Sequence, residues 1–193
     1  MIKASNKDKE IVIDILTSAF ESYKEDSSIN LIVKQDEKRV ERMRVLMGYL
    51  FERAMLFGDV FLSDDKEACV LIKYTEKEKV TLKTIWFDIG LVFRCIGVKG
   101  LIKVIKRQYI AKRHYPKENH IRPMIIGVKS GVKGKIKAGK LMLSVLKYHS
   151  ANKLPVIIDT VSEYNLRLYQ KIGFKIIEKE TSLGFPIYFL RIN

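Results

Sequence analysis

The stretch Gly127–Met142, GVKSGVKGKIKAGKLM, decides the fold. The apolar run Met124–Ile126 precedes it, and an amphipathic helical pattern follows it. A strand, a glycine- and lysine-rich turn and a helix start together build an anion site, because a helix N-terminus offers unpaired N–H groups and partial positive charge. The stretch holds no carboxylate and these lysines: Lys129, Lys133, Lys135, Lys137 and Lys140. It therefore predicts a phosphate site at the start of a helix.

The residues after this turn predict a helix over Ala138–Ser150 and then a strand over Pro155–Thr160. One face of the helix carries its apolar residues and a histidine that we expect to be packed: Ala138, Leu141, Met142, Val145, Leu146 and His149. A strand–helix–strand crossover favours parallel pairing and leaves the helix N-terminus at the carboxyl end of the first strand. Ligands bind at that position in open α/β sheets.

The rest of the chain alternates between strand and helix patterns, with no repeat and no linker. In the first half we expect a strand over Met1–Ala4, a helix capped by Ser5 or Asn6, a helix over Asp36–Phe57 and a hairpin of Val60–Ser63 with Ala68–Tyr74. A broken helix over Val80–His114 and a strand over His120–Val128 follow. The chain then closes with a helix over Glu163–Ile172, ended by Gly173, and a hairpin of Phe174–Glu178 with Ile187–Ile192. The chain is expected to form a single domain over residues 1–193.

Composition indicates a soluble protein. With 193 residues, 47% of them hydrophobic, the chain can bury a full core. Cys69 and Cys95 lie in apolar runs and are expected to be buried free thiols in a reducing compartment. The N-terminus lacks an apolar leader, and the apolar stretch Thr84–Val98 is too short to span a bilayer. We therefore expect a cytoplasmic protein without a membrane span.

The net charge of +14 favours polyanionic partners. No acidic residue lies between Ile89 and Lys117. Helical spacing there predicts an outward basic face (Lys99, Lys103, Lys106 and Arg107) and an inward apolar face (Leu101, Ile102, Ile105 and Tyr109). This basic face is either an ordinary solvated surface or a contact for an acidic substrate, a cofactor phosphate or a membrane. Nucleic acid is not expected as a partner, and a homodimer is left open.

A second motif, Asn165–Phe174 (NLRLYQKIGF), adds a resemblance to a known family. Together with the strand ending at Val128 and the turn after it, this segment resembles the GCN5-related N-acetyltransferase superfamily. The resemblance implies the acyl-CoA N-acyltransferase fold, an α/β (α+β) domain with a mixed, mostly antiparallel central sheet flanked by helices. It also implies an enzyme that moves an acetyl group from acetyl-CoA directly to a primary amine of a small molecule or peptide.

The resemblance assigns roles to residues of both motifs. Tyr169 matches the tyrosine that hydrogen-bonds the sulfur and acts as general acid, and the Val128 N–H faces the thioester oxygen. The residues expected to bind acetyl-CoA are Ile126, Gly127, Val128, Lys133, Gly134, Lys135, Ile136, Lys137, Ala138, Gly139 and Asn165. Asn165 either contacts the pantetheine arm or caps its helix. No metal is expected.

The turn departs from the family pattern R/Q-x-x-G-x-G/A. Lys133 stands at the R/Q position, Ile136 at the first glycine and Ala138 at the second. Either the loop is shifted or Ile136 points into the core. The alternative function is a catalytically impaired, acetyltransferase-like module that binds CoA or a polyanion. The general base is not identified by the sequence; the candidates are Glu118, His120, Asp159 and Glu163, with His120 or Asp159 preferred.

Overall fold

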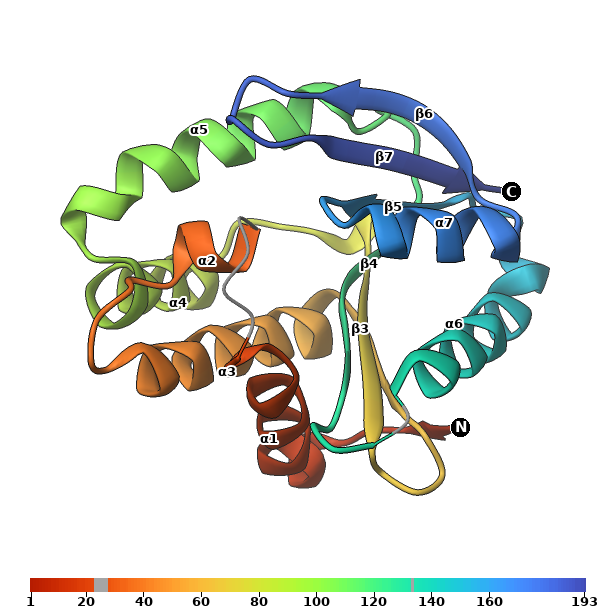
Figure 1. The fold of residues 1–193 in the computed structure, drawn as a ribbon, viewed down its shortest axis with the longest axis horizontal. Helices are drawn as coiled ribbons and strands as arrows, with labels where there is room; N and C mark the ends of the chain where they lie inside the picture. Colours follow the sequence, from red (N-terminus) through yellow and green to blue (C-terminus); the bar gives the residue numbers. More distant parts are fainter. Residues whose placement is uncertain (23–27, 133) are drawn as a thin grey trace.

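The computed structural model describes residues 1–22, 28–132 and 134–193, with the backbone alone described at 28, 98, 99, 134 and 135. Its strands are β1 (Ile2–Lys3), β2 (Gly58–Leu62), β3 (Ala68–Tyr74), β4 (Ile121–Val128), β5 (Val156–Thr160), β6 (Lys175–Glu180) and β7 (Ile187–Ile192). They form one sheet in the order β1-β2-β3-β4-β5-β7-β6 (Figure 1). Only the β4–β5 pair is parallel, which confirms the predicted mixed, mostly antiparallel sheet.

The helices lie on both faces of this sheet. They are α1 (Lys9–Phe20), α2 (Ser28–Ile32), α3 (Arg39–Phe57), α4 (Leu82–Leu91), a π-helical turn η3 (Val92–Ile96), α5 (Val98–His114), α6 (Gly134–His149) and α7 (Glu163–Ile172), with short 3-10 turns η1 (Asn6–Asp8), η2 (Thr75–Lys77) and η4 (Ser150–Asn152). One apolar cluster joins α1 and α3 to the sheet, and a second joins α6 and α7 to the opposite face. Figure 1 shows these two sides to the left and right of β3 and β4.

Local signals explain several element boundaries. Ser5 caps the first helical turn, since its hydroxyl accepts from the Lys7 N–H at 3.3 Å and its own N–H donates to Asp8. The helix α7 begins after Ser162, whose hydroxyl accepts from the Asn165 N–H at 3.4 Å, and ends at Gly173, whose φ is 110°. A left-handed residue of this kind costs glycine no steric strain. The predicted bounds of α7 are therefore confirmed.

The strands β4 and β5 meet only at their first residues. Ile121 pairs with Val156, and the Ile121 N–H donates to the Pro155 carbonyl at 2.9 Å. Every second residue of a parallel strand bonds to its neighbour, so residue 123 would be the next donor on β4. It is Pro123, which has no N–H and cannot continue the ladder. A bulge follows, because Ile72 pairs with Pro123 while Leu71 pairs with Ile125.

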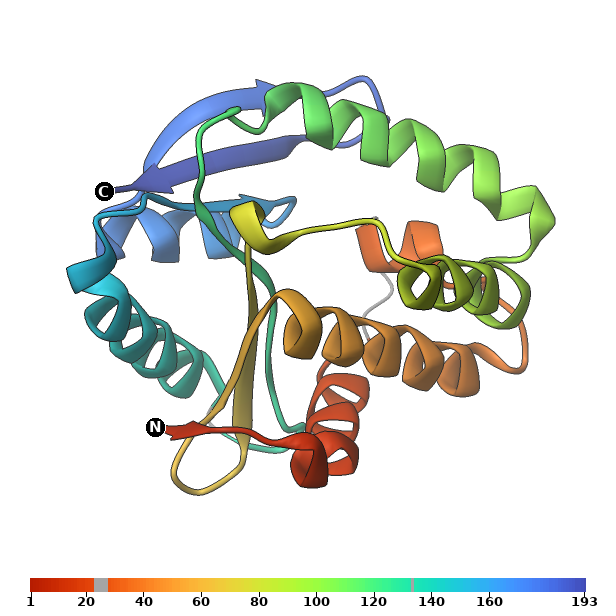
Figure 2. The ribbon, with the colours of Figure 1, turned by 180° about the vertical axis from the view of Figure 1, so that it is seen from behind.

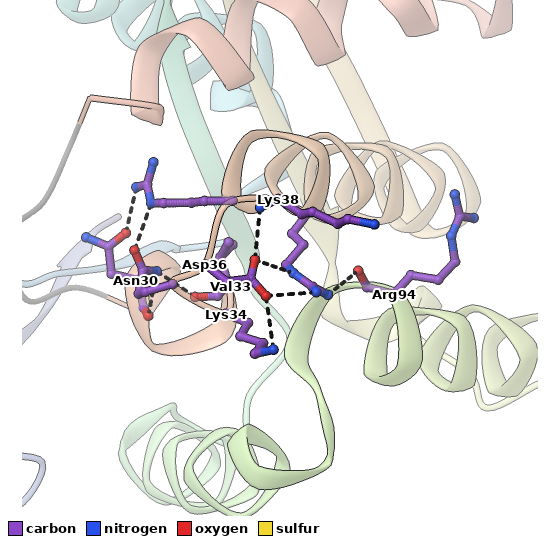
Figure 3. A network of polar contacts seen from close by, with 9 residues as sticks. Asn30, Val33, Lys34, Asp36, Lys38 and Arg94 are labelled. Atoms are coloured by element: carbon purple, nitrogen blue, oxygen red, sulfur yellow. Dashed lines mark hydrogen bonds and ion pairs between the residues drawn. The ribbon is translucent and has the colours of Figure 1, made fainter.

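The segment between α2 and α3 is fixed by a polar network (Figure 3). Arg42 holds Asp36 through two contacts of 2.9 and 3.0 Å and donates to the Arg94 carbonyl at 3.1 Å. Lys34 reaches the same carboxylate at 3.0 Å, and its N–H donates to the Cys95 carbonyl at 3.2 Å. The network thus ties the start of α3 to η3, the turn that follows α4.

The broken helix predicted over Val80–His114 is confirmed as α4, η3 and α5. The break falls at Gly97, where φ is 72°. Figures 1 and 2 show α4 and the start of α5 at the same end of the molecule. Among the described residues, no helix is long and apolar enough to cross a membrane.

The predicted orientation of α5 is wrong. Ile102, Ile105 and Tyr109 are exposed, whereas Val104 and Arg107 on the opposite side are buried. Arg107 faces inward because it forms an ion pair with Asp159 on β5. The apolar spacing marked a helix but did not identify the side that faces the core.

Candidate active site

The open edge of β4 is the centre of the candidate site. Ser63 donates its N–H to the Ala68 carbonyl at 2.9 Å, and Lys129 donates its N–H to the Glu67 carbonyl at 2.8 Å. Because Ala68 is paired with Val128, these bonds place Val128 at a non-hydrogen-bonded position of the β3–β4 ladder. The N–H groups of Val128 and Ile126 therefore point away from β3, toward the side where β5 has diverged. Two donors predicted to face the ligand line this edge.

Burial along β4 agrees with an open edge. Although β4 lies in the middle of the sheet, most of its side chains are only half-buried, while β3 beside it is almost fully buried. Gly127 has a different role from the predicted cofactor contact. Its N–H and carbonyl face β3, and a Cβ built there would lie 2.8 Å from Leu16 Cδ2 of α1. Gly127 is thus the residue that lets α1 lie close against β4.

The start of α6 brings helix N–H groups to the end of the same strand. The helix begins at Gly134, four residues before the predicted start at Ala138. The N–H groups of Ala138 and Gly139 are consequently used inside the helix, and the free ones are those of Gly134, Lys135 and Ile136. Lys133, predicted to meet phosphate, lies outside the described residues.

The structure excludes one of the two alternatives for Ile136 and gives Lys137 partners that the sequence did not reveal. The Ile136 side chain is 63% exposed in the first turn of α6, so it does not point into the core. Lys137 reaches Asp65 at 2.5 Å and also pairs with Glu67, both on the loop between β2 and β3. The stretch itself holds no carboxylate, but the fold supplies two, and they raise the pKa of Lys137 through hydrogen bonds. Lys137 is engaged by these carboxylates and not presented to the open edge.

Tyr169 and Asn165 lie one helical turn apart on α7. Tyr169 is buried and packs against Phe174 at 5.7 Å between ring centroids. Burial, and then the charge of Asp159, raise the pKa of Tyr169 to about 12, so the phenol keeps its proton at neutral pH. Its hydroxyl makes no hydrogen bond within the described residues. Asn165 is half-buried. Ser162, and not Asn165, caps the helix, which was one of the two roles expected for Asn165.

Asp159 is held by a cluster that the sequence did not reveal. Its carboxylate pairs with Arg107, accepts from Tyr115 Oη and lies 3.3 Å from the Arg122 guanidinium. Burial alone would raise its pKa, but the charges of Arg107 and Arg122 and these hydrogen bonds hold it at about 2. A carboxylate of this acidity is a poor proton acceptor, so the geometry argues against Asp159 as the general base.

Arg122 is the residue of this cluster that has an unused hydrogen-bond donor in the described part of the chain. Its guanidinium stacks on the Tyr115 ring at 4.0 Å, and its Nε is buried with no partner among the described residues. The sequence held one signal for this cluster: Arg122 is a charged residue within the apolar strand β4, and Asp159 is one within β5. The pairing itself depends on the fold, because the cluster joins α5, β4 and β5.

His120 is the other preferred base. It is buried directly before β4, and its Nδ1 lies 2.8 Å from the Glu118 carbonyl. Donation to that carbonyl leaves Nε2 with the lone pair. Burial lowers the pKa of His120, so the ring is neutral at physiological pH and able to take a proton. Glu118 itself pairs with Arg191, and Glu163 is exposed at the start of α7.

A large hollow lies elsewhere and does not belong to this site. Its volume is about 830 Å³, and its lining comes from α1, α3, α4 and η3, on the side of α3 that faces away from the sheet. None of its lining residues lies on a strand. Within the described residues, no group of three or more His, Cys, Asp and Glu side chains is placed to hold a metal ion.

Comparison with known proteins finds the same fold among solved structures of acetyltransferases. No protein-family model matches the sequence, and no curated protein matches it. A solved structure described as a histone acetyltransferase and related acetyltransferase, from Corynebacterium glutamicum, is similar at a TM-score of 0.70 and 15% identity, over 98% of this chain and 93% of that one. An arylalkylamine N-acetyltransferase from Aedes aegypti is similar at 0.68 and 12%, over 99% and 96%.

A further solved structure is the C-terminal condensation domain of Ebony in complex with β-alanyl-dopamine, similar at a TM-score of 0.68 and 11% identity, over 99% of this chain and 96% of that one. Another, a putative acetyltransferase of the GNAT family from Desulfovibrio desulfuricans, is similar at 0.56 and 10%, over 100% and 96%. At such identities a likeness speaks for the fold alone. The chain has the fold of the GCN5-related N-acetyltransferases.

Proposed function

We propose that the protein is an acetyl-CoA-dependent N-acetyltransferase that acetylates a primary amine of a small molecule or peptide by direct transfer. The observation that carries the proposal is the open edge of β4. The N–H groups of Ile126 and Val128 line it, the N-terminus of α6 lies at its end, and Tyr169 and Asn165 come from α7. Acetyl-CoA is extended and carries amide groups and a pyrophosphate, so backbone donors and a helix N-terminus suit it.

The chemistry requires a neutral amine, a polarised thioester and a protonated leaving group. An alkylamine of pKa about 10.4 costs about 4 kcal/mol to deprotonate at neutral pH, so a base or a desolvated site must offset that cost. The eight residues that follow His120 up to Val128 span roughly 26 Å along an extended strand, so His120 is not placed to take this proton at the Val128 end of β4. The amine nitrogen attacks the thioester carbon, and the Val128 N–H stabilises the negative oxygen that forms. The carbon–sulfur bond then breaks and the thiolate takes the Tyr169 proton. The nitrogen loses one proton to solvent as it becomes an amide, and Tyr169 regains its proton from solvent.

Binding and turnover test the proposal separately. Acetyl-CoA at about 100 times its dissociation constant should add about 2.7 kcal/mol of stability, which raises Tm by roughly 5–10 °C in a domain of this size. An unchanged Tm at millimolar acetyl-CoA would overturn the proposal. A raised Tm with no thiol release across a panel of primary amines would identify a CoA-binding module without turnover.

Tyr169→Phe tests the assignment of the proton donor. It should lower the rate of thiol release by about 10²-fold or more, because general acid catalysis contributes factors of that size. The stabilisation by acetyl-CoA should be unchanged. Tyr164→Phe on the same helix is the matched control and should keep full activity. Equal rates in both variants would show that Tyr169 only packs against Phe174.

A further inference from the structure

The segment from α4 to η3 presents an apolar stripe to the solvent. Its members recur every three or four residues and are 42–80% exposed: Leu82, Ile85, Trp86, Ile89 and Phe93. The opposite side of the same segment packs inward through Thr84, Leu91 and Cys95. Apolar helix faces normally lie against the core. Here one side of the helix meets the core and a second apolar side has no partner among the described residues.

The orientation of this helix is fixed by specific polar contacts. Thr81 and Thr84 form a capping box at its start. Asp88 accepts from Tyr49 Oη at 2.7 Å, and the Arg94 carbonyl accepts from Arg42 at 3.1 Å (Figure 3). A rotation that buried the outer stripe would break these contacts. These contacts therefore keep the stripe on the solvent-facing side of the helix.

The next helix, α5, repeats the arrangement. Ile102, Ile105 and Tyr109 form a stripe that is 76, 56 and 68% exposed. Exposed cationic side chains surround it: Lys103, Lys106, Lys112 and Arg113. Arg107 and Val104 hold the other side of the helix inward. Since α4 and the start of α5 lie at the same end of the molecule, we name both stripes with their cationic neighbours the α4–α5 surface (Figure 1).

The charge of the α4–α5 surface identifies its partner. No acidic residue occurs from Ile89 to Lys117. A second copy of the chain in a two-fold contact would place this basic surface against itself. Exposed aliphatic side chains gain nothing from nucleic acid. Basic residues beside Trp, Phe and Ile instead match the requirements of an anionic bilayer surface, where apolar groups enter the acyl boundary and cations meet the headgroups.

We propose that the α4–α5 surface docks the protein on anionic lipid membranes, as a peripheral contact and not a span. Trp86 is the only tryptophan of the chain and is 71% exposed, so its emission reports on this surface directly. The full chain is mixed with vesicles of about seven parts phosphatidylcholine to three parts phosphatidylglycerol, and with pure phosphatidylcholine. We expect co-sedimentation and a blue shift of Trp86 emission with the anionic vesicles alone, both weakened by salt.

Substitutions separate the apolar and electrostatic contributions. Phe93→Glu and Ile102→Glu should each weaken partitioning by about tenfold or more, since each removes an apolar group that would enter the bilayer and adds a charge that the anionic lipid repels. Lys103→Gln and Lys106→Gln should weaken it by about fivefold each, equivalent to ~1 kcal/mol per cation. The control Leu143→Glu changes a side chain that is 51% exposed on α6 and should bind normally. Urea unfolding confirms that each variant is folded.

Four outcomes would overturn the proposal. The first is an absence of binding to either vesicle, and the second is equal loss of binding in Leu143→Glu. The third is a lipid-free dimer with shielded Trp86 emission that Phe93→Glu dissociates, which would assign the α4–α5 surface to a second copy. Retention on an acidic protein without vesicle binding would likewise replace the membrane by that class of partner.

Discussion

Helices α6 and α5 carry equally regular apolar spacing, yet only α6 buries the face that its spacing marks. In α6 the residues Leu141, Met142 and Val145 all lie in the core. In α5 the residues Ile102, Ile105 and Tyr109 all lie in solvent. The difference is that most apolar residues of α6 lie on the side that is buried, whereas α5 has a second side that can be buried, completed by Arg107 with its acidic partner Asp159. Spacing predicts a helix, and the identity of its partner decides which side is inward.

The largest effect expected from this comparison is on stability. Leu141→Ala should lower the free energy of unfolding by about 3–4 kcal/mol, because it leaves a cavity in the core. The matched Ile105→Ala should change it by no more than about 0.5 kcal/mol, because Ile105 is exposed and alanine is a better helix former. Urea unfolding of both variants measures the contrast. Similar losses would mean that the Ile105 stripe is covered in solution.

The next effect concerns the side of α5 that is buried. Arg107→Leu should destabilise the protein by about 2–3 kcal/mol, somewhat less than is usual for a broken buried pair because Arg122 and Tyr115 still hold Asp159. The neighbouring Lys106→Leu should be near neutral, since Lys106 is exposed. The folded pKa of Asp159, about 2, lies below its ordinary value of 3.8, so the stabilisation is complete above pH 3.8 and is lost toward pH 2.

The pH dependence of Arg107→Leu follows from this depressed pKa. Without Arg107 the pKa of Asp159 is lowered less, so the variant loses less stability when this carboxylate is protonated. The difference in free energy of unfolding between variant and wild type should therefore narrow between pH 4 and 2. A deficit independent of pH over that range, measured by urea unfolding, would show that Arg107 acts through packing and not through the charge of Asp159.

The smallest effect tests the start of α6. Asp65→Asn combined with Glu67→Gln releases Lys137 and removes two negative charges near a helix N-terminus. Acetyl-CoA affinity should rise by about fivefold, equivalent to ~1 kcal/mol, as expected for a partly exposed contact with phosphate. Isothermal titration measures it, with Asp64→Asn in the same loop as control. Unchanged affinity in the double variant would place the pyrophosphate away from Lys137.

Local chemistry made several elements predictable. The bounds of α7 followed from Ser162 and Gly173, and the β2–β3 hairpin from two apolar runs separated by a polar turn. The start of α6 was placed four residues late, because Gly134 and Lys135 carry no capping or apolar signal that marks a helix start. The sheet and its parallel crossover were confirmed, since the pattern of strands and helices allows few arrangements.

The sequence predicts only part of the candidate active site, because several of its contacts join residues that are far apart along the chain. Tyr169 and Val128 were selected by motif, and their placement in the fold remains the basis of a proposal. The contacts of Lys137 with Asp65 and of Arg122 with Asp159 join residues that are far apart along the chain, so no local pattern announces them. Pro123 was visible within the predicted strand, but its consequence for β5 required knowledge of which neighbour that position faces.

The single contact between β4 and β5 divides the sheet into two blocks that share almost no backbone ladder. The strands β1–β4 form one block and β5–β7 the other, each continuously hydrogen-bonded within itself. Shear between the blocks is resisted by the side chains of α6 and α7 and by the salt bridges of Asp159. An elongated ligand bound between β4 and β5 would act as an eighth strand and hold the two blocks together. When it dissociated, the two blocks could again move relative to each other.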